Sequence, residues 1–169
     1  MSVIDQVLKG NEEYAKNFML ADLPIPPAKK LAVVACMDAR LTVSQLLGLK
    51  TGDAHIIRNA GGLITEGALR SLIISHHLLG TQEFMIINHT DCGMLTFTDE
   101  ELRKQLREKT QAGTIGVLPA SFHPFSDLEE NLREQIQKAK SHPWIPNHIP
   151  VRGFIYDVKT GRLKEVSAD

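Results

Sequence analysis

The chain has few cysteines, few aromatic residues and no excess of charge of either sign. Only two of its 169 residues are cysteine, Cys36 and Cys92. A domain of this length can bury a sufficient core without disulfide staples. In a reducing compartment, two isolated thiols are more typical of metal binding or catalysis than of a structural disulfide. The two cysteines are therefore candidates for chemistry.

The balance of charge excludes one class of partner. The 19 basic side chains are nearly matched by 20 acidic ones, which gives a formal net charge of −1. Nucleic-acid binding depends on concentrated Lys and Arg, so nucleic acid is not expected as a partner. The sequence also lacks an apolar run of membrane-spanning length, and MSVIDQVLKG does not have the pattern of a signal peptide. We expect a cytoplasmic protein with no membrane partner.

The first 30 residues are predicted to form a helix followed by an extended arm. Ser2 and Asp5 can form a capping box. Apolar residues recur at helical spacing on one face: Val3, Ile4, Val7, Leu8, Tyr14 and Phe18. Prolines at positions 24, 26 and 27 then exclude further helix. With its apolar face free, this helix is expected to pack on a partner subunit.

The remainder alternates between apolar runs and helical segments. Strands are expected at residues 31–35, 54–57, 83–88, 151–158 and 162–166, and helices at 41–47, 65–79, 98–108 and from a cap at Ser126 with Glu129. The helix at 65–79 is apolar on most faces and should be well buried, whereas the last helix has one solvated face. Residues 111–125 are expected to form a loop.

This alternation predicts a single α/β domain over residues 1–169. It contains a mostly parallel twisted sheet of four strands, an antiparallel edge strand, helices on both faces and the N-terminal helical arm.

Two unusual clusters follow the carboxyl ends of apolar strands. One is Cys36-Met37-Asp38-Ala39-Arg40 and the other is His89-Thr90-Asp91-Cys92-Gly93. In open α/β sheets, ligands bind beyond the carboxyl ends of the strands, where the winding direction reverses. If the two strands are neighbours at that point, Cys36, His89 and Cys92 converge on one crevice.

Two thiolates and one imidazole are a common set of zinc ligands, and three protein ligands leave a fourth position for water or substrate. Each part alone is a weak signal, because a buried cysteine at a strand end is usually a small hydrophobic residue. The combination uses both cysteines of the chain and predicts a Zn²⁺ site.

Asp38 and Arg40 have two interpretations. Most Asp–Arg pairs are solvated and contribute little to stability. Beside a zinc ion whose charge is neutralised by two thiolates, however, Asp38 can orient the attacking water while Arg40 holds the carboxylate ionised. Asp38 could instead bind the zinc ion and close the site.

CMDAR, RNAGG and HTDCGM, in this order and spacing, resemble the compact subgroup of the β-class carbonic anhydrases. The similarity extends from the N-terminal arm to the final RGFIYDVKTGRL, although Ala39 stands where many members have Ser. The resemblance implies that Cys36, His89 and Cys92 bind Zn²⁺ and that Asp38 and Arg40 form the family's catalytic dyad. It further implies reversible hydration of carbon dioxide to bicarbonate by a homodimer, which can pair into a homotetramer.

Asn59, Ala60, Gly61 and Gly93 are expected to shape the substrate pocket, although turn formation would explain them equally well. Two alternatives remain open. One is a hydrolase of carbon disulfide or carbonyl sulfide with the same zinc site, and the other is a zinc-stabilised binding module without catalysis.

Overall fold

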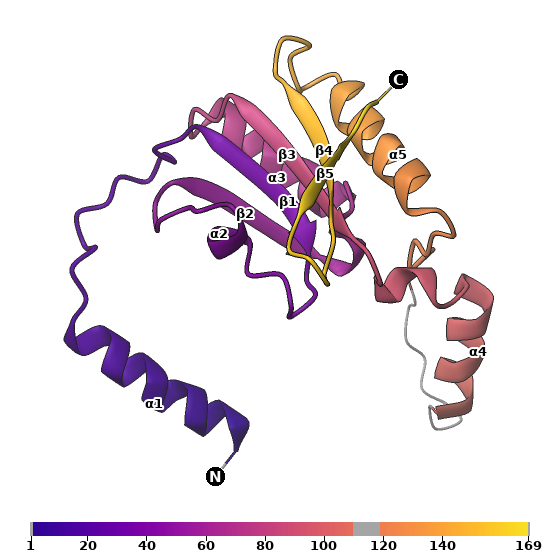
Figure 1. Ribbon diagram of the computed structural model, residues 1–169, viewed down its shortest axis with the longest axis horizontal. Helices are drawn as coiled ribbons and strands as arrows, with labels where there is room; N and C mark the ends of the chain where they lie inside the picture. Colours follow the sequence, from indigo (N-terminus) through magenta and orange to yellow (C-terminus); the bar gives the residue numbers. More distant parts are fainter. Residues whose placement is uncertain (1, 110–118, 169) are drawn as a thin grey trace.

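The computed structural model describes residues 2–109 and 119–168, which form a five-stranded sheet with helices around it (Figure 1). The strand order is β2-β1-β3-β4-β5. The strands are β1 (Leu31–Cys36), β2 (Ala54–Asn59), β3 (Glu83–His89), β4 (Val151–Tyr156) and β5 (Leu163–Val166). The first four are parallel and β5 is antiparallel to β4, which confirms the predicted sheet.

The described residues also contain five α-helices and two short 3₁₀ turns. They are α1 (Val3–Lys16), α2 (Val43–Leu46), η1 (Ala60–Gly62), α3 (Glu66–His77), η2 (Gly93–Leu95), α4 (Asp99–Lys109) and α5 (Leu128–Lys140). Of the predicted loop at 111–125, residues 111–118 lie outside the described part of the chain, and residues 119–125 have no regular secondary structure.

The winding direction of the chain reverses between β1 and β3. β2 pairs with one edge of β1, and β3 pairs with the other edge, in both cases in parallel. Parallel strands that diverge in this way leave a crevice beyond their carboxyl ends. The residues that follow β1 and β3 therefore meet at this end of the sheet.

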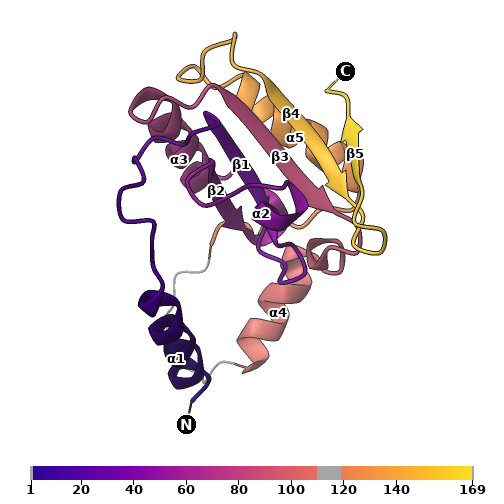
Figure 2. The same ribbon diagram turned by 60° about the vertical axis from the view of Figure 1, so that its left-hand side comes forward.

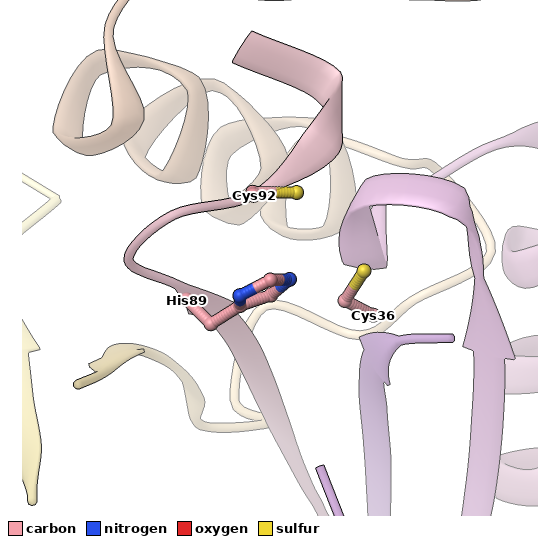
Figure 3. A group of neighbouring side chains, drawn as sticks. All are labelled: Cys36, His89 and Cys92. Atoms are coloured by element: carbon pink, nitrogen blue, oxygen red, sulfur yellow. The ribbon is translucent and has the colours of Figure 1, made fainter. Parts of the chain in front are cut away.

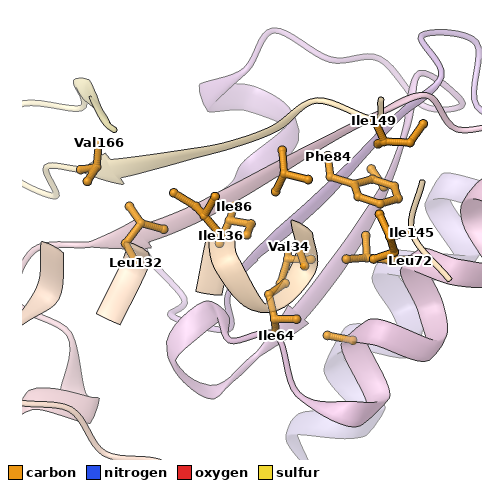
Figure 4. Packing of buried hydrophobic residues seen from close by; sticks show 14 of the residues in the cluster. Val34, Ile64, Leu72, Phe84, Ile86, Leu132, Ile136, Ile145, Ile149 and Val166 are labelled. Atoms are coloured by element: carbon orange, nitrogen blue, oxygen red, sulfur yellow. The ribbon is translucent and has the colours of Figure 1, made fainter. Parts of the chain in front are cut away.

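The two faces of the sheet are covered unequally. On one face, α3 and α5 pack against β1, β3 and β4 through a large apolar cluster that includes Leu72, Phe84, Ile86, Leu132 and Ile136 (Figure 4). On the other face, the four-residue helix α2 covers a smaller cluster. Helices thus lie on both faces, as expected, but the second face is only thinly covered.

Helix α3 is less buried than its sequence predicted. Only Ala68, Leu72 and Ser75 are buried, and Leu78 just beyond the helix is 75% exposed. These three residues form one stripe that contacts the sheet, whereas Leu69 and Ile73 beside it are only half-buried against the same core. The prediction of a well-buried helix was wrong because an apolar residue is buried only where another element covers it.

Helix α5 also differs from the prediction. Its N-cap is Asp127 rather than Ser126, because the Asp127 carboxylate accepts a hydrogen bond from the Glu130 N–H at 2.8 Å. In addition, Asn131 and Gln135 are buried although they are polar. The face expected to be solvated is therefore partly inside the protein.

Strand β4 ends at Tyr156, two residues earlier than predicted. The Asp157 carboxylate accepts the backbone N–H of Lys159 at 2.8 Å and starts the turn into β5.

Helix α1 stands apart from the sheet at the end of an extended arm (Figures 1 and 2). The predicted capping box between Ser2 and Asp5 is present, but no residue of the helix is buried. Val3 and Ile4 are 73% and 69% exposed. Within the described residues, no helix is long and apolar enough to cross a membrane.

Candidate metal centre

The carboxyl ends of β1 and β3 bring three potential metal ligands together (Figure 3). Cys36 is the last residue of β1, His89 is the last residue of β3, and Cys92 is the N-cap of η2. Their ligand atoms lie within 4.8 Å of one another. All three side chains are buried, with exposed fractions of 5%, 0% and 3%. The predicted convergence of these residues is confirmed.

His89 is oriented with one ring nitrogen free. Its Nδ1 lies 2.9 Å from the carbonyl oxygen of Thr90, and a carbonyl can only accept, so Nδ1 carries the proton. Its Nε2 is the one buried side-chain nitrogen or oxygen without a hydrogen-bond partner in the described part of the chain. Such an atom is costly to bury. A metal ion among the three side chains would give Nε2 its partner.

The two thiols share a proton. The neighbouring Cys92 thiol lowers the pKa of Cys36 to about 4, although burial opposes this shift. Cys36 and burial in turn raise the pKa of Cys92. Burial opposes a charge on His89 as well, but the Cys36 sulfur and the Thr90 carbonyl raise its pKa. A cation that binds all three groups would replace the shared proton.

This donor set fits zinc. Two sulfurs and one imidazole nitrogen are borderline-soft ligands, which Zn²⁺ accepts readily and Mg²⁺ or Ca²⁺ does not. The site has three protein donors rather than four, and the Asp38 carboxylate lies at its edge, with Oδ2 3.7 Å from His89 Nε2. The residues present therefore fit a zinc ion with one further position.

Arg40 holds Asp38 through a paired contact. Arg40 Nε donates to Asp38 Oδ1 at 3.0 Å, Nη2 donates to Oδ2 at 2.8 Å, and the Arg40 backbone N–H donates to Oδ1 at 2.9 Å. These hydrogen bonds keep the pKa of Asp38 well below its usual range and raise that of Arg40. The carboxylate is therefore ionised throughout the neutral pH range.

Two charged residues near the site were not singled out from the sequence. Arg58, on β2, donates from Nε to the Cys36 carbonyl at 3.0 Å and from Nη2 to the Asp38 carbonyl at 2.6 Å. Asp91 accepts a hydrogen bond from Arg40 Nη1 at 2.9 Å. Both lie inside motifs that were recognised, RNAGG and HTDCGM, and their polar character within those motifs was the available signal.

The backbone of Gly62 packs closely against the backbone of Cys36. Its φ is +65°, and an added Cβ would lie 2.8 Å from both the Cys36 nitrogen and the Ile87 carbonyl oxygen. Neither backbone atom can move without displacing a central strand. Only glycine fits this position.

A series of hydrogen bonds between buried side-chain amides holds the turn that contains Gly61 and Gly62. Asn88 donates to the carbonyls of Gly61 and Gly62 at 2.9 and 3.2 Å. Asn131 donates to Asn88 at 2.8 Å, and Gln135 donates to Asn131 at 3.1 Å. Helix α5 is thereby connected to the turn that borders the metal centre.

The predicted pocket residues lie on two turns around the centre. Asn59 makes two hydrogen bonds of 2.8 Å with the backbone of Leu63 and so closes the η1 turn. Ala60 is exposed, and Gly61 is buried beside Met94. Gly93 is exposed, and an added Cβ there would meet nothing within 4 Å.

Apolar side chains border the ligands on one side. Leu41 and Met94 are buried together with Cys36 and Cys92, and Phe97 and Phe125 are among the half-buried residues that pack against them. A small uncharged molecule would find little competition from bound water on such a surface.

A parallel α/β sheet with a buried Cys-His-Cys donor set at its switch point, and with an ionised carboxylate beside it, defines an α/β protein with a group of side chains that could hold a metal ion. The sequence profile of the family described as carbonic anhydrase matches residues 31–163. The chain belongs to the carbonic anhydrase family, an enzyme family, and within it to the β class.

Relatives with similar sequences and structures match nearly the full length of the chain. The chain is 45% identical over 168 residues to Beta-carbonic anhydrase 1 of Mycobacterium tuberculosis, with 99% of each sequence covered. It is 34% identical over 183 residues to a carbon disulfide hydrolase of Acidithiobacillus thiooxidans, covering 97% of this chain and 90% of that protein. The solved structure of carbonic anhydrase from Streptococcus mutans matches with a TM-score of 0.89 and 46% identity, over 99% of both chains. The family inferred from the motifs is confirmed.

Proposed function

We propose that Cys36, His89 and Cys92 bind Zn²⁺ and that the chain catalyses the reversible hydration of carbon dioxide to bicarbonate and a proton. One observation carries the ligand assignment: three buried donor atoms lie within 4.8 Å of one another, and His89 Nε2 has no other partner. When bound, the zinc ion supplies a Lewis acid that makes water a sufficiently strong nucleophile near neutral pH.

Asp38 and Arg40 are the proposed catalytic pair. The Asp38 carboxylate, ionised and fixed by two hydrogen bonds from the Arg40 side chain, accepts a hydrogen bond from the attacking water and orients its lone pair. Asp38 also has a second role in this proposal. Its Oδ2 lies 3.7 Å from His89 Nε2, so a modest movement would let it occupy the fourth metal position and close the site.

Carbon dioxide is proposed to lie on the apolar side of the centre, near Leu41 and Met94. Asn59, Ala60, Gly61 and Gly93 are the proposed lining of the substrate pocket, since the two turns that contain them border the ligands. In this arrangement the apolar surface binds the uncharged substrate weakly, and the charged product is released toward water.

A second candidate substrate class is carbon disulfide or carbonyl sulfide. The relative from Acidithiobacillus thiooxidans, named carbon disulfide hydrolase, is 34% identical to this chain. The proposed metal centre would suit either linear substrate. Parallel assays of the purified zinc protein with carbon dioxide, carbon disulfide and carbonyl sulfide distinguish them. Turnover of a sulfur substrate with negligible carbon dioxide hydration between about pH 6 and 9 would overturn the proposal.

We also propose a homodimer, which can pair into a tetramer, of a single domain whose residues 1–30 pack on the partner subunit. No residue of α1 is buried within its own chain, and β2 is an edge strand whose Ile56 is 37% exposed. Both cysteines are free, as metal binding requires, and this supports a cytoplasmic location.

The decisive experiment is stopped-flow carbon dioxide hydration measured against pH, with zinc content determined on the same sample. A protein with one zinc ion per chain and no hydration activity would favour a zinc-stabilised binding module. Such a module should also keep four protein ligands at every pH. The absorption spectrum of a cobalt-substituted sample would then not change with pH.

A further inference from the structure

The guanidinium of Arg40 lies between two carboxylates that come from different loops. On one side, Nε and Nη2 donate to Asp38. On the other side, Nη1 donates to Asp91 Oδ2 at 2.9 Å, and Nη2 donates to the Asp91 carbonyl oxygen at 3.0 Å. Arg40 therefore connects the loop after β1 with the turn that joins His89 to Cys92.

Asp91 contributes its main chain as well as its side chain to this contact. Its φ is +57°, in the left-handed region that residues other than glycine seldom adopt, although Asp tolerates it better than most. In this conformation its carboxylate and its carbonyl oxygen both accept hydrogen bonds from the same guanidinium. The turn is thus built so that one residue offers two acceptors to Arg40.

We infer that Asp91 is a positioning residue for the reaction: it fixes the guanidinium of Arg40 from behind, so that Arg40 holds the Asp38 carboxylate toward the metal centre. The inference rests on the proposed function of Asp38. Without the Asp91 side chain, Arg40 would keep Asp38 and the Asp91 carbonyl as partners, but its Nη1 would lose its acceptor, and its exposed side chain could move together with Asp38.

Asp91 also has an electrostatic effect of opposite sign. Its negative charge competes with Asp38 for Arg40, so its removal would strengthen the attraction between Arg40 and Asp38. Since the side chains of Asp91 and Arg40 are 71% and 47% exposed, solvent screens this charge effect. Orientation of the guanidinium by hydrogen bonds is the larger effect, and removal of the Asp91 side chain should lower activity.

The test compares Asp91→Gly with Asp91→Asn. Glycine removes the side chain and accepts the positive φ, whereas asparagine keeps an oxygen that can accept from Nη1 and also tolerates that φ. Asp91→Gly should lower kcat about three- to tenfold with little change in KM and an unchanged zinc content. Asp91→Asn should restore kcat to within about twofold of the parent protein.

Two measurements separate positioning from a merely structural role. First, in an NMR experiment on ¹⁵N-labelled protein, the Nε–H signal of Arg40 should exchange with solvent faster in Asp91→Gly than in the parent. Second, Asp91→Gly should have no further effect on kcat in an Arg40→Lys background, because lysine lacks the guanidinium that Asp91 holds.

An equal loss of kcat from Asp91→Gly in both backgrounds, or a fall in activity with no change at Arg40, would overturn the inference. The control is Lys30→Gly, which relieves a positive φ of 51° away from the site and should leave kcat unchanged. If the parent zinc protein itself shows no carbon dioxide hydration, the proposed function fails. The Arg40 signal then still reports whether Asp91 fixes the guanidinium.

Discussion

Asp38 lies two residues beyond the end of β1, at the edge of the three potential metal ligands. Its carboxylate is hydrogen-bonded to Arg40 and lies 3.7 Å from His89 Nε2. In the proposed function, Cys36, His89 and Cys92 bind the metal, and Asp38 orients the attacking water. A substitution of Asp38 can therefore change activity without changing metal binding.

Asp38→Asn should leave zinc binding intact and reduce kcat/KM by about 10²-fold or more, because the amide cannot act as an ionised acceptor for the attacking water. Zinc content by atomic spectroscopy and stopped-flow hydration on the same sample provide the measurement. Asp22→Asn, which changes an exposed aspartate in the N-terminal arm, is the matched control and should retain full activity. Normal activity in Asp38→Asn would remove this residue from the mechanism.

Metal uptake should release protons, and the directions of the pKa shifts determine how many. Cys36 and Cys92 are coupled: the pKa of Cys36 is lowered and that of Cys92 is raised, so the pair retains about one proton at neutral pH. The raised pKa of His89 adds a further fraction of a proton that metal must displace. Binding should thus release about one to two protons, and zinc affinity should increase as pH rises.

Calorimetric titration of the metal-free protein at about pH 7.5, in buffers with different ionisation enthalpies, counts the protons directly. A zinc affinity that is independent of pH between about 6 and 8 would contradict this assignment of the shared proton.

At the scale of elements, η1 determines where β1 can place Cys36. Gly62→Ala should destabilise the protein by roughly 2–5 kcal/mol, because its Cβ would clash with two strand backbones and its φ of +65° would be strained. Chemical denaturation and zinc affinity measure the effect. Gly80→Ala is the control: its φ is +73° but an added Cβ meets nothing within 4 Å, so it should cost only about 1–2 kcal/mol and leave zinc affinity unchanged.

Equal losses in Gly62→Ala and Gly80→Ala would show that backbone conformation alone, rather than the close approach to Cys36, accounts for the requirement for glycine in η1.

Most elements could be predicted from the sequence because their signals are local. The continuous apolar runs of β1 and β3 predict buried strands. The clusters at Cys36 and His89 are recognisable because ionisable groups seldom follow a buried strand. The contacts of Asn131 and Gln135 were not predictable in this way. An amide on a polar helix face looks solvated until its buried partner, here Asn88, is known, and that residue is 43 positions away from Asn131.

Arg58 and Asp91 were missed for a related reason. Their partners are backbone carbonyls and a side chain on another loop, at separations of 20 to 51 residues. A sequence pattern can show that a charged residue is present in a motif, but only the paired strands determine which groups it can reach. Similarly, Ile74 on α3 is only half-buried, and the sequence does not show how far neighbouring elements cover such a residue.

At the scale of the whole molecule, no residue of α1 is buried against the described residues of its own chain. An isolated helix of 14 residues is marginally stable in water, and the apolar residues of α1 are exposed. Since α1 is proposed to pack on a partner subunit, a variant without residues 2–20 should dissociate at a protein concentration at which the full chain is still associated. Analytical ultracentrifugation over a dilution series measures this difference.

A single substitution gives a sharper version of this experiment. Val7→Asp places a charge on the apolar face of α1 and should weaken association at least about tenfold. Glu12→Asp on the same helix should leave association unchanged. A truncated chain with the same dimer dissociation constant as the full chain would show that α1 does not form the subunit contact.

The buried amides of Asn88, Asn131 and Gln135 have a consequence for how the protein opens. Helix α5 cannot leave the sheet without breaking the hydrogen bond from Asn131 to Asn88 and the one from the Ile64 N–H to Gln135, and Asn88 in turn donates to the carbonyls of Gly61 and Gly62. Fluctuations that expose α5 and those that expose the turn behind Cys36 should thus be one event, with one opening free energy. The backbone amides of both segments should exchange their hydrogens with solvent at the same slow rate, as a single cooperative unit.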